Sequence, residues 1–219
     1  MALAGAGLHG RSPSVTPIPA AITETLIAAG RRLDARGWVP ATAGNFSMRL
    51  GPDRIAVTRS GVHKGFLRPD SLMVVDLAGQ PEDSALRPSA ETGLHCGIYR
   101  RFPGTGAVLH GHSIANTVLS RAVGGSLTLS GYELLKAFPG LSTHGASAEV
   151  PVVDNDQDIA RMQSGLEARW DSMGASPPPG YLIRGHGSYI WAADMPGALA
   201  RFEALEFMLD CELATRRSA

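Results

Sequence analysis

The order of apolar and polar residues predicts helices and strands that alternate along the chain. Apolar residues recur at helical spacing from Ile22 to Leu33, which predicts an amphipathic helix over residues 20–36. Short apolar or alternating runs predict a strand hairpin at 45–50 and 54–58, strands at 72–76, 107–112 and 126–129, a strand ending at 153, and a strand pair over 181–192. Helical spacing predicts further helices at 88–101, 114–122, 156–170 and from 195 onward. Residues 131–136 are expected to form a turn or a short helix. Ser113 and Asp194 precede two of these helices and are expected to cap them. Since no repeat or linker interrupts the alternation, we expect one α/β domain with a layered sheet.

Composition narrows the class of protein. A chain of 219 residues with 44% hydrophobic residues buries a sufficient core without a disulfide or structural metal. The chain has 20 Lys and Arg residues and 20 Asp and Glu residues, so its formal net charge is zero. No net positive charge therefore attracts it to nucleic acid or to an anionic membrane. We therefore expect neither partner. Residues 1–18, rich in small residues and punctuated by proline, are expected to form a disordered N-terminal tail.

The predicted compartment is the cytoplasm. No segment approaches the roughly 18 consecutive apolar residues of a membrane span, and the first residues lack the basic start of a signal peptide. Cys96 and Cys211 lie far apart within helical patterns, which argues against a disulfide framework. Both are expected to be buried apolar residues and not nucleophiles.

Three histidines carry the strongest chemical signal. His110 and His112 are two apart on a predicted strand, so their side chains point to one face and form a chelating pair. His186 lies at a strand end between Gly185 and Gly187. Three neutral imidazoles with open positions are typical of a catalytic metal site. The alternative is that they are hydrogen-bonded histidines at a sheet edge.

The other histidines are weaker candidates. His9 lies in the expected tail, and His144 lies in a loop. His95 falls on the predicted helix 88–101, where we expect it on the outer or interface side. All three are interpreted as structural or surface residues.

A second group of residues predicts an anion site. Ser60, Gly61 and Lys64 share a loop that can present backbone N–H groups and a positive charge to a phosphate. The segment 42–45 has the same small, donor-rich character, and Ser89 stands at a helix N-terminus. Read alone, the first loop is only a turn. A phosphorylated substrate is expected if the fold brings these pieces together.

Two carboxylates are candidate acids or bases. Glu91 stands in the first predicted turn of its helix and Glu133 follows Tyr132, and each is also explained as an ordinary surface charge. Their spacing does not decide between them. The chain lacks the Gly-x-Ser-x-Gly elbow, the P-loop and the dinucleotide fingerprint, which disfavours serine hydrolases, nucleotide hydrolases and nicotinamide dehydrogenases.

The sequence resembles the class II aldolase/adducin-head superfamily over residues 20–214. The segments that carry the resemblance are Gly44-Asn45, Thr58-Arg59-Ser60-Gly61, Pro88-Ser89-x-Glu91, His110-x-His112 and His186-Gly187. It implies a three-layer α/β/α sandwich around a mixed, largely antiparallel sheet, with a catalytic domain over 19–216. It also implies a homotetramer with active sites between subunits.

Within this superfamily, residues 131–136, 151–158 and 185–191 resemble the dehydratases that act on methylthioribulose 1-phosphate. This resemblance implies one zinc ion per subunit, held by His110, His112 and His186. It implies an acid/base at Glu133, and Glu91 matches the carboxylate that serves the aldolases as a base or an extra metal ligand. Phosphate-binding positions are implied at Asn45, Ser60, Gly61 and Ser89, and charge and proximity add Lys64.

The expected reaction is zinc-dependent dehydration of 5-methylthioribulose 1-phosphate to 2,3-diketo-5-methylthiopentyl 1-phosphate in methionine salvage. One alternative is a sugar-phosphate aldolase or epimerase with the same metal chemistry. Another is a non-catalytic scaffold of the adducin-head kind, which retention of the three histidines disfavours. Iron, manganese or cobalt would also accept three imidazoles.

Overall fold

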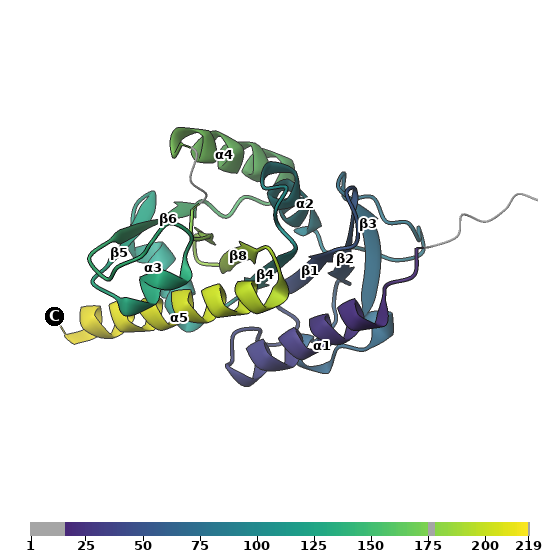
Figure 1. Cartoon of the computed structure of the whole chain (residues 1–219), viewed down its shortest axis with the longest axis horizontal. Helices are drawn as coiled ribbons and strands as arrows, with labels where there is room; N and C mark the ends of the chain where they lie inside the picture. The colour runs from purple at the N-terminus through teal and green to yellow at the C-terminus, as the bar shows by residue number, and fades with distance from the viewer. Residues whose placement is uncertain (1–15, 175–177, 219) are drawn as a thin grey trace, which may run out of the picture.

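An eight-stranded mixed sheet runs through the described residues, 16–174 and 178–218, of this computed structural model (Figure 1). The strand order is β3-β2-β1-β4-β8-β7-β6-β5. The strands are β1 (Asn45–Arg49), β2 (Arg54–Thr58), β3 (Leu72–Asp76), β4 (Ala107–Gly111), β5 (Ser126–Ser130), β6 (Ser147–Val153), β7 (Tyr181–Ile183) and β8 (Ser188–Ala192). Every neighbouring pair is antiparallel except β6 and β7, which are parallel.

Helices cover both faces of this sheet. The helices are α1 (Ala20–Ala35), α2 (Thr92–Arg101), α3 (Ile114–Ala122), α4 (Ile159–Ser172) and α5 (Met195–Ser218), with short 3₁₀ helices η1 (Lys64–Phe66), η2 (Pro69–Ser71) and η3 (Glu133–Ala137). Helices α2 and α4 lie on one face, and α1, α3 and α5 contribute to the core on the other (Figure 1). The expected three-layer α/β/α architecture with a mixed, largely antiparallel sheet is confirmed.

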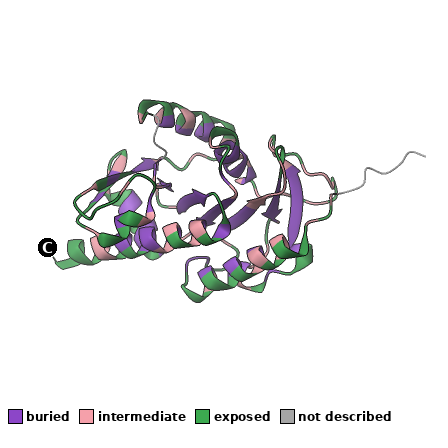
Figure 2. Cartoon of the chain, in the orientation of Figure 1, coloured by how far each residue is buried: buried purple, intermediate pink, exposed green. Residues whose placement is uncertain are grey.

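The sheet separates two hydrophobic cores, as strand geometry requires. On β4, Ala107 and Leu109 pack into the core beneath α1, α3 and α5, and Val108 packs into the core beneath α2 and α4. Successive strand residues point to opposite faces, so a central strand that is apolar throughout supplies both cores. Figure 2 shows this strand buried along its length.

Two helices have the N-terminal caps that the sequence predicts, and a third helix begins later than predicted. The Ser113 hydroxyl accepts a hydrogen bond from the Asn116 N–H at 2.9 Å, and the Asp194 carboxylate accepts one from the Gly197 N–H at 2.8 Å. Helix α2 begins at Thr92, so Glu91 lies just before the helix and not in its first turn.

Most of the expected N-terminal tail lies outside the described residues. Residues 1–15 are outside the described residues, and Thr16 donates hydrogen bonds to Glu82 from its backbone and its hydroxyl. Among the helices of residues 16–174 and 178–218, none combines the length and apolar character needed to cross a bilayer.

Candidate active site

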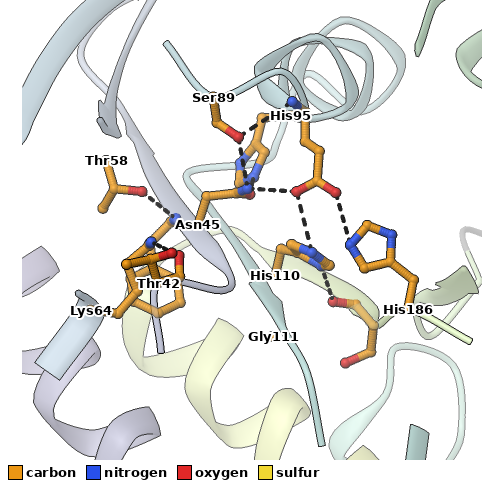
Figure 3. A network of polar contacts seen from close by, with 12 residues as sticks. Thr42, Asn45, Thr58, Lys64, Ser89, His95, His110, Gly111 and His186 are labelled. Atoms are coloured by element: carbon orange, nitrogen blue, oxygen red, sulfur yellow. Dashed lines mark hydrogen bonds and ion pairs between the residues drawn. The ribbon is translucent and has the colours of Figure 1, made fainter. Parts of the chain in front are cut away.

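The fold brings His110, His112 and His186 together. Strand β4 carries His110 and leads directly into His112, and the turn between β7 and β8 carries His186. One ring nitrogen from each lies within 4.8 Å of the other two. The predicted chelating pair and the distant third imidazole therefore converge, and Figure 3 shows the rings of His110 and His186 close to each other.

His110 presents an unprotonated nitrogen to this cluster. Its ring is fully buried, and Nδ1 lies 2.9 Å from the Ser188 carbonyl oxygen, which only accepts, so Nδ1 carries the hydrogen. Burial lowers the pKa of His110 to about 4, and the ring is neutral. Nε2 therefore has a free lone pair, and it has no hydrogen-bond partner. A backbone carbonyl that sets the tautomer in this way is the usual support of a metal-binding histidine.

The other two histidines also suit a cation. Burial, followed by charge repulsion from His110 and His186, lowers the pKa of His112 to about 3. Nδ1 of His186 is buried without a hydrogen-bond partner. Neutral imidazole is the form that binds metal, so the donor set fits a divalent cation.

Glu91 completes the cluster with a carboxylate. Oε1 lies 3.0 Å from Nε2 of His186, and Oε2 accepts a hydrogen bond from Nδ2 of Asn45 at 2.8 Å. Burial raises the pKa of the Glu91 carboxyl, but hydrogen bonds from His186 and Asn45 favour the ionised form, and the pKa is held well below its ordinary 4.5. Glu91 is thus ionised and adds negative charge beside the three rings.

Two glycines allow these close approaches. A Cβ on Gly187 would lie 2.8 Å from Cε1 of His110 and would collide with the Gly111 carbonyl oxygen. Gly44 has φ +76°, and a Cβ there would lie 2.7 Å from the His110 carbonyl oxygen. Glycine is therefore required at both positions next to the candidate metal ligands.

A cavity of about 300 Å³ opens beside the cluster. Its lining residues are Thr42, Ala43, Gly44, Asn45, Arg59, Ser60, Gly61, Lys64, Ser89, Glu91, His112 and His186. All five predicted phosphate-binding residues are among them. The separate donor-rich segments noted in the sequence therefore meet in one place, next to two of the histidines.

Lys64 contributes a buried positive charge to this cavity. Its side chain is only 2% exposed, and Nζ donates hydrogen bonds of 2.7 Å to the carbonyl oxygens of Thr42 and Val62 (Figure 3). Burial lowers its pKa to about 8, and the negative charge of Glu91 acts in the opposite direction. Both hydrogen-bond partners are uncharged, so an anion in the cavity would supply a missing counter-charge.

A second cavity, of about 620 Å³, also borders His112 and His186. Its walls include Pro40 and two residues one helical turn apart on α3, Ile114 and Val118, which are 73% and 42% exposed. This second cavity therefore offers apolar contacts where the first offers charge and hydrogen-bond donors.

Glu133 does not line either cavity of its own chain. It lies on η3 with its side chain 67% exposed, forms an ion pair with Lys136, and lies 3.4 Å from Nδ1 of His144, an exposed loop residue as expected. The hydrogen bond from Lys136 lowers the pKa of Glu133, so this carboxylate is ionised. Of the two predicted carboxylates, the fold brings only Glu91 to the histidines.

The structure also reveals residues that sequence reasoning missed. Arg59 lines the first cavity; its position next to Ser60 in the same loop was the available signal. The expected outer placement of His95 is wrong: the side chain is fully buried and contacts Asn45 and Ser47 on β1, because this side of α2 faces the sheet. Cys96 is buried as expected, and Cys211 is partly buried.

Comparison with known proteins places this site in a family. Residues 24–213 match the family described as Class II Aldolase and Adducin N-terminal domain. The chain belongs to the class II aldolase and adducin N-terminal domain family.

Members of this class II aldolase family with assigned names are closely similar. The methylthioribulose-1-phosphate dehydratase of Granulibacter bethesdensis is 54% identical over 216 residues, covering 96% of this chain and 99% of the relative. The protein of the same name from Pseudomonas aeruginosa is 52% identical over 194 residues, covering 88% of this chain and 93% of the relative. The crystal structure of L-fuculose-1-phosphate aldolase from Thermus thermophilus matches with a TM-score of 0.73 and 26% identity, covering 90% of this chain and 95% of the other.

Proposed function

We propose that this chain is a metal-dependent hydro-lyase that converts 5-methylthioribulose 1-phosphate into 2,3-diketo-5-methylthiopentyl 1-phosphate and water, a step of methionine salvage. Relatives named for this dehydratase activity match nearly the whole chain at more than half identity. The observation that carries the proposal is that His112 and His186 border both a positively charged cavity and an apolar one.

The two cavities suit the two ends of this substrate. The phosphate would lie in the first cavity, against Lys64 and Arg59 and the donors of Asn45, Ser60, Gly61 and Ser89. The methylthio end would lie in the second cavity, against Ile114 and Val118. The reacting carbons would then lie between the cavities, beside the histidines. Holding both ends orients these carbons for reaction.

A divalent cation fits the histidine cluster, and we propose zinc, one ion per subunit. His110, His112 and His186 would hold it, with the carboxylate of Glu91 alongside. When bound, such an ion supplies Lewis-acid polarisation of a sugar carbonyl oxygen. Neutral rings and unpartnered buried nitrogens support this assignment.

Proton transfer is assigned to Glu133. A carboxylate takes the proton from C3 and assists loss of the C4 hydroxyl as water, which leaves an enol that becomes the diketone. In its own chain Glu133 is exposed and lines neither cavity. We therefore propose a homotetramer with active sites between subunits, in which Glu133 of one chain serves the histidines of another.

The reaction is proposed to take place in the cytoplasm. Cys96 and Cys211 are both free thiols, which suits a reducing compartment. Burial raises the pKa of Cys96 to about 11, so its thiol is a poor nucleophile.

The second candidate is a sugar-phosphate aldolase, favoured by the match to the L-fuculose-1-phosphate aldolase structure. Both reactions begin from a phosphorylated ketose and differ in whether a C–O or a C–C bond breaks. The relatives favour the dehydratase, because the Granulibacter bethesdensis protein of that name is 54% identical to this chain and the aldolase is 26% identical.

Mass spectrometry of the products separates these functions. We expect the zinc-loaded protein to convert 5-methylthioribulose 1-phosphate into a product lighter by one water, and His112→Ala to lose this activity. An aldehyde fragment in place of that product would reject dehydration. No turnover, together with parental zinc binding by His112→Ala, would favour a non-catalytic scaffold.

A further inference from the structure

A line of buried hydrogen bonds lies behind the cavity residue Asn45. His95, on α2, is fully buried and faces β1. Its Nε2 is hydrogen-bonded to Oδ1 of Asn45, and its Nδ1 lies 2.7 Å from the hydroxyl of Ser47. Ser47 is in turn 3.1 Å from the hydroxyl of Tyr99. Figure 3 shows His95 directly against Asn45, on the side away from Lys64.

The direction of each hydrogen bond follows from two groups that can only accept. The Glu91 carboxylate is an acceptor, so the NH₂ group of Asn45 must face it and Oδ1 must face His95. Since Oδ1 also only accepts, Nε2 of His95 must carry its hydrogen. Burial lowers the pKa of His95 to about 4, so the ring is neutral and Nδ1 accepts from Ser47.

Asn45 is thereby held in one of its two amide orientations. Nδ2 donates to Oε2 of Glu91 at 2.8 Å and lies 3.3 Å from the hydroxyl of Ser89. Both neighbours line the cavity that holds Lys64. The amide hydrogens therefore face the carboxylate and the anion cavity, and the amide oxygen faces the protein interior.

We propose that His95 is a positioning residue that fixes the Asn45 amide with its NH₂ group toward Glu91 and the phosphate end of the substrate; the substrate part of this inference rests on the proposed function. Without the Nε2–H donor, Oδ1 of Asn45 is a buried acceptor with no partner, and only the hydrogen bond to Glu91 still opposes rotation of the amide. The reversed amide presents an oxygen to the Glu91 carboxylate and to any bound anion, and these contacts are repulsive.

A double-mutant cycle with inorganic phosphate as the probe tests the inference. Phosphate affinity of the zinc-loaded protein is measured by titration calorimetry for the parent, His95→Leu, Asn45→Ala and the double variant. We expect each single variant to weaken phosphate binding about ten-fold and the double variant to match Asn45→Ala, because His95 acts through Asn45. Additive losses would overturn the inference.

Two further variants separate positioning from general structural support. The substitution His95→Gln retains an amide donor toward Asn45, and we expect affinity within about three-fold of the parent. Tyr99→Phe removes only the far hydroxyl of the line, and it is expected to leave affinity unchanged. Failure of His95→Gln to rescue, or a Tyr99→Phe loss equal to that of His95→Leu, would overturn the inference.

Dehydration measured on the same proteins distinguishes failure of this inference from failure of the proposed function. A parent that dehydrates its substrate while His95→Leu keeps parental kcat/KM and phosphate affinity rejects the role of His95 alone. A parent that shows the expected coupling but makes no diketone rejects the proposed function alone. A parent that binds no phosphate overturns the inference, because the Asn45 amide would then have no anion to hold.

Discussion

Oε2 of Glu91 lies 3.3 Å from Nε2 of His110, a nitrogen that carries no hydrogen because Nδ1 donates to the Ser188 carbonyl. Two atoms with lone pairs therefore face each other in a buried place. Such a contact is unfavourable unless a cation lies next to both atoms. The contact between Glu91 and His110 therefore supports a metal ion at the histidine cluster independently of the family match. The Glu91 carboxylate would also contribute negative charge beside that ion.

Replacing the charge of Glu91 is expected to weaken metal binding. Glu91→Gln keeps the size of the side chain but removes the negative charge beside His110 and His186. We expect the zinc dissociation constant, measured by competition with a chelator, to rise about ten-fold or more. Glu149→Gln is the matched control, because Glu149 is 53% exposed, forms an ion pair with Arg169 and lines neither cavity. Equal zinc affinities in parent and Glu91→Gln would contradict this role.

Lys64 is expected to provide charge for phosphate binding. Lys64→Met keeps an apolar side chain in the buried space but removes the ammonium. We expect the phosphate dissociation constant to rise at least about ten-fold, the effect of losing a charge-assisted hydrogen bond. Lys136→Met removes an exposed lysine on η3 and should leave binding unchanged. If both variants bind phosphate like the parent, the anion site lies elsewhere.

Glu206 is expected to make stability depend on pH. It is fully buried on α5, and its Oε1 accepts hydrogen bonds from Asn116 and Ser188. Burial raises its pKa from 4.5 to about 7, and the hydrogen bonds oppose this only in part. The folded state therefore holds the proton more tightly than the unfolded chain. The resulting stabilisation is complete below pH 4.5 and is lost as pH rises through 7.

Urea unfolding of the metal-free protein at several pH values measures this effect. The parent should lose about 3 kcal/mol of unfolding free energy from this group between pH 4.5 and 8. Glu206→Gln, which does not titrate, should lack this loss and be more stable than the parent at pH 8. Parallel pH profiles for the two proteins would show that Glu206 is already ionised in the folded state at low pH.

Mixed assemblies test whether Glu133 acts between subunits. His112→Ala and Glu133→Gln are each expected to be inactive alone. In tetramers assembled at random from equal amounts of the two, about one quarter of sites combine an intact histidine cluster with an intact Glu133 from a neighbour. We therefore expect about a quarter of parental dehydration activity. If Glu133 served its own chain, no mixed site would be complete and no activity would return.

The local pattern predicted the elements that carry the candidate metal ligands. Period-two spacing placed His110 and His112 side by side, and β4 has the expected start. The convergence of His186 depends on the pairing of β8 with β4, a contact between segments nearly eighty residues apart that no local pattern contains. The resemblance to a known family supplied that contact. The parallel pairing of β6 with β7 is non-local in the same way.

Burial was the property that the sequence predicted least well. His95 was assigned to an outer helix face because its immediate neighbours do not reveal that α2 packs its polar side against Ser47 and Asn45. Lys64 was expected to present its charge to a phosphate from a glycine-containing loop, but the loop sequence does not reveal that its ammonium is buried against two backbone carbonyls. Both residues are polar groups whose partners lie on other elements, so only the assembled fold shows their environment.

The central claim is that three imidazoles share one metal ion beside the phosphate cavity. The direct measurement is an anomalous difference map at the zinc edge from a crystal of the zinc-loaded protein. The account predicts one strong peak per subunit, within coordination distance of ring nitrogens of His110, His112 and His186. A map with no peak there, or with zinc bound only at other residues, would contradict it.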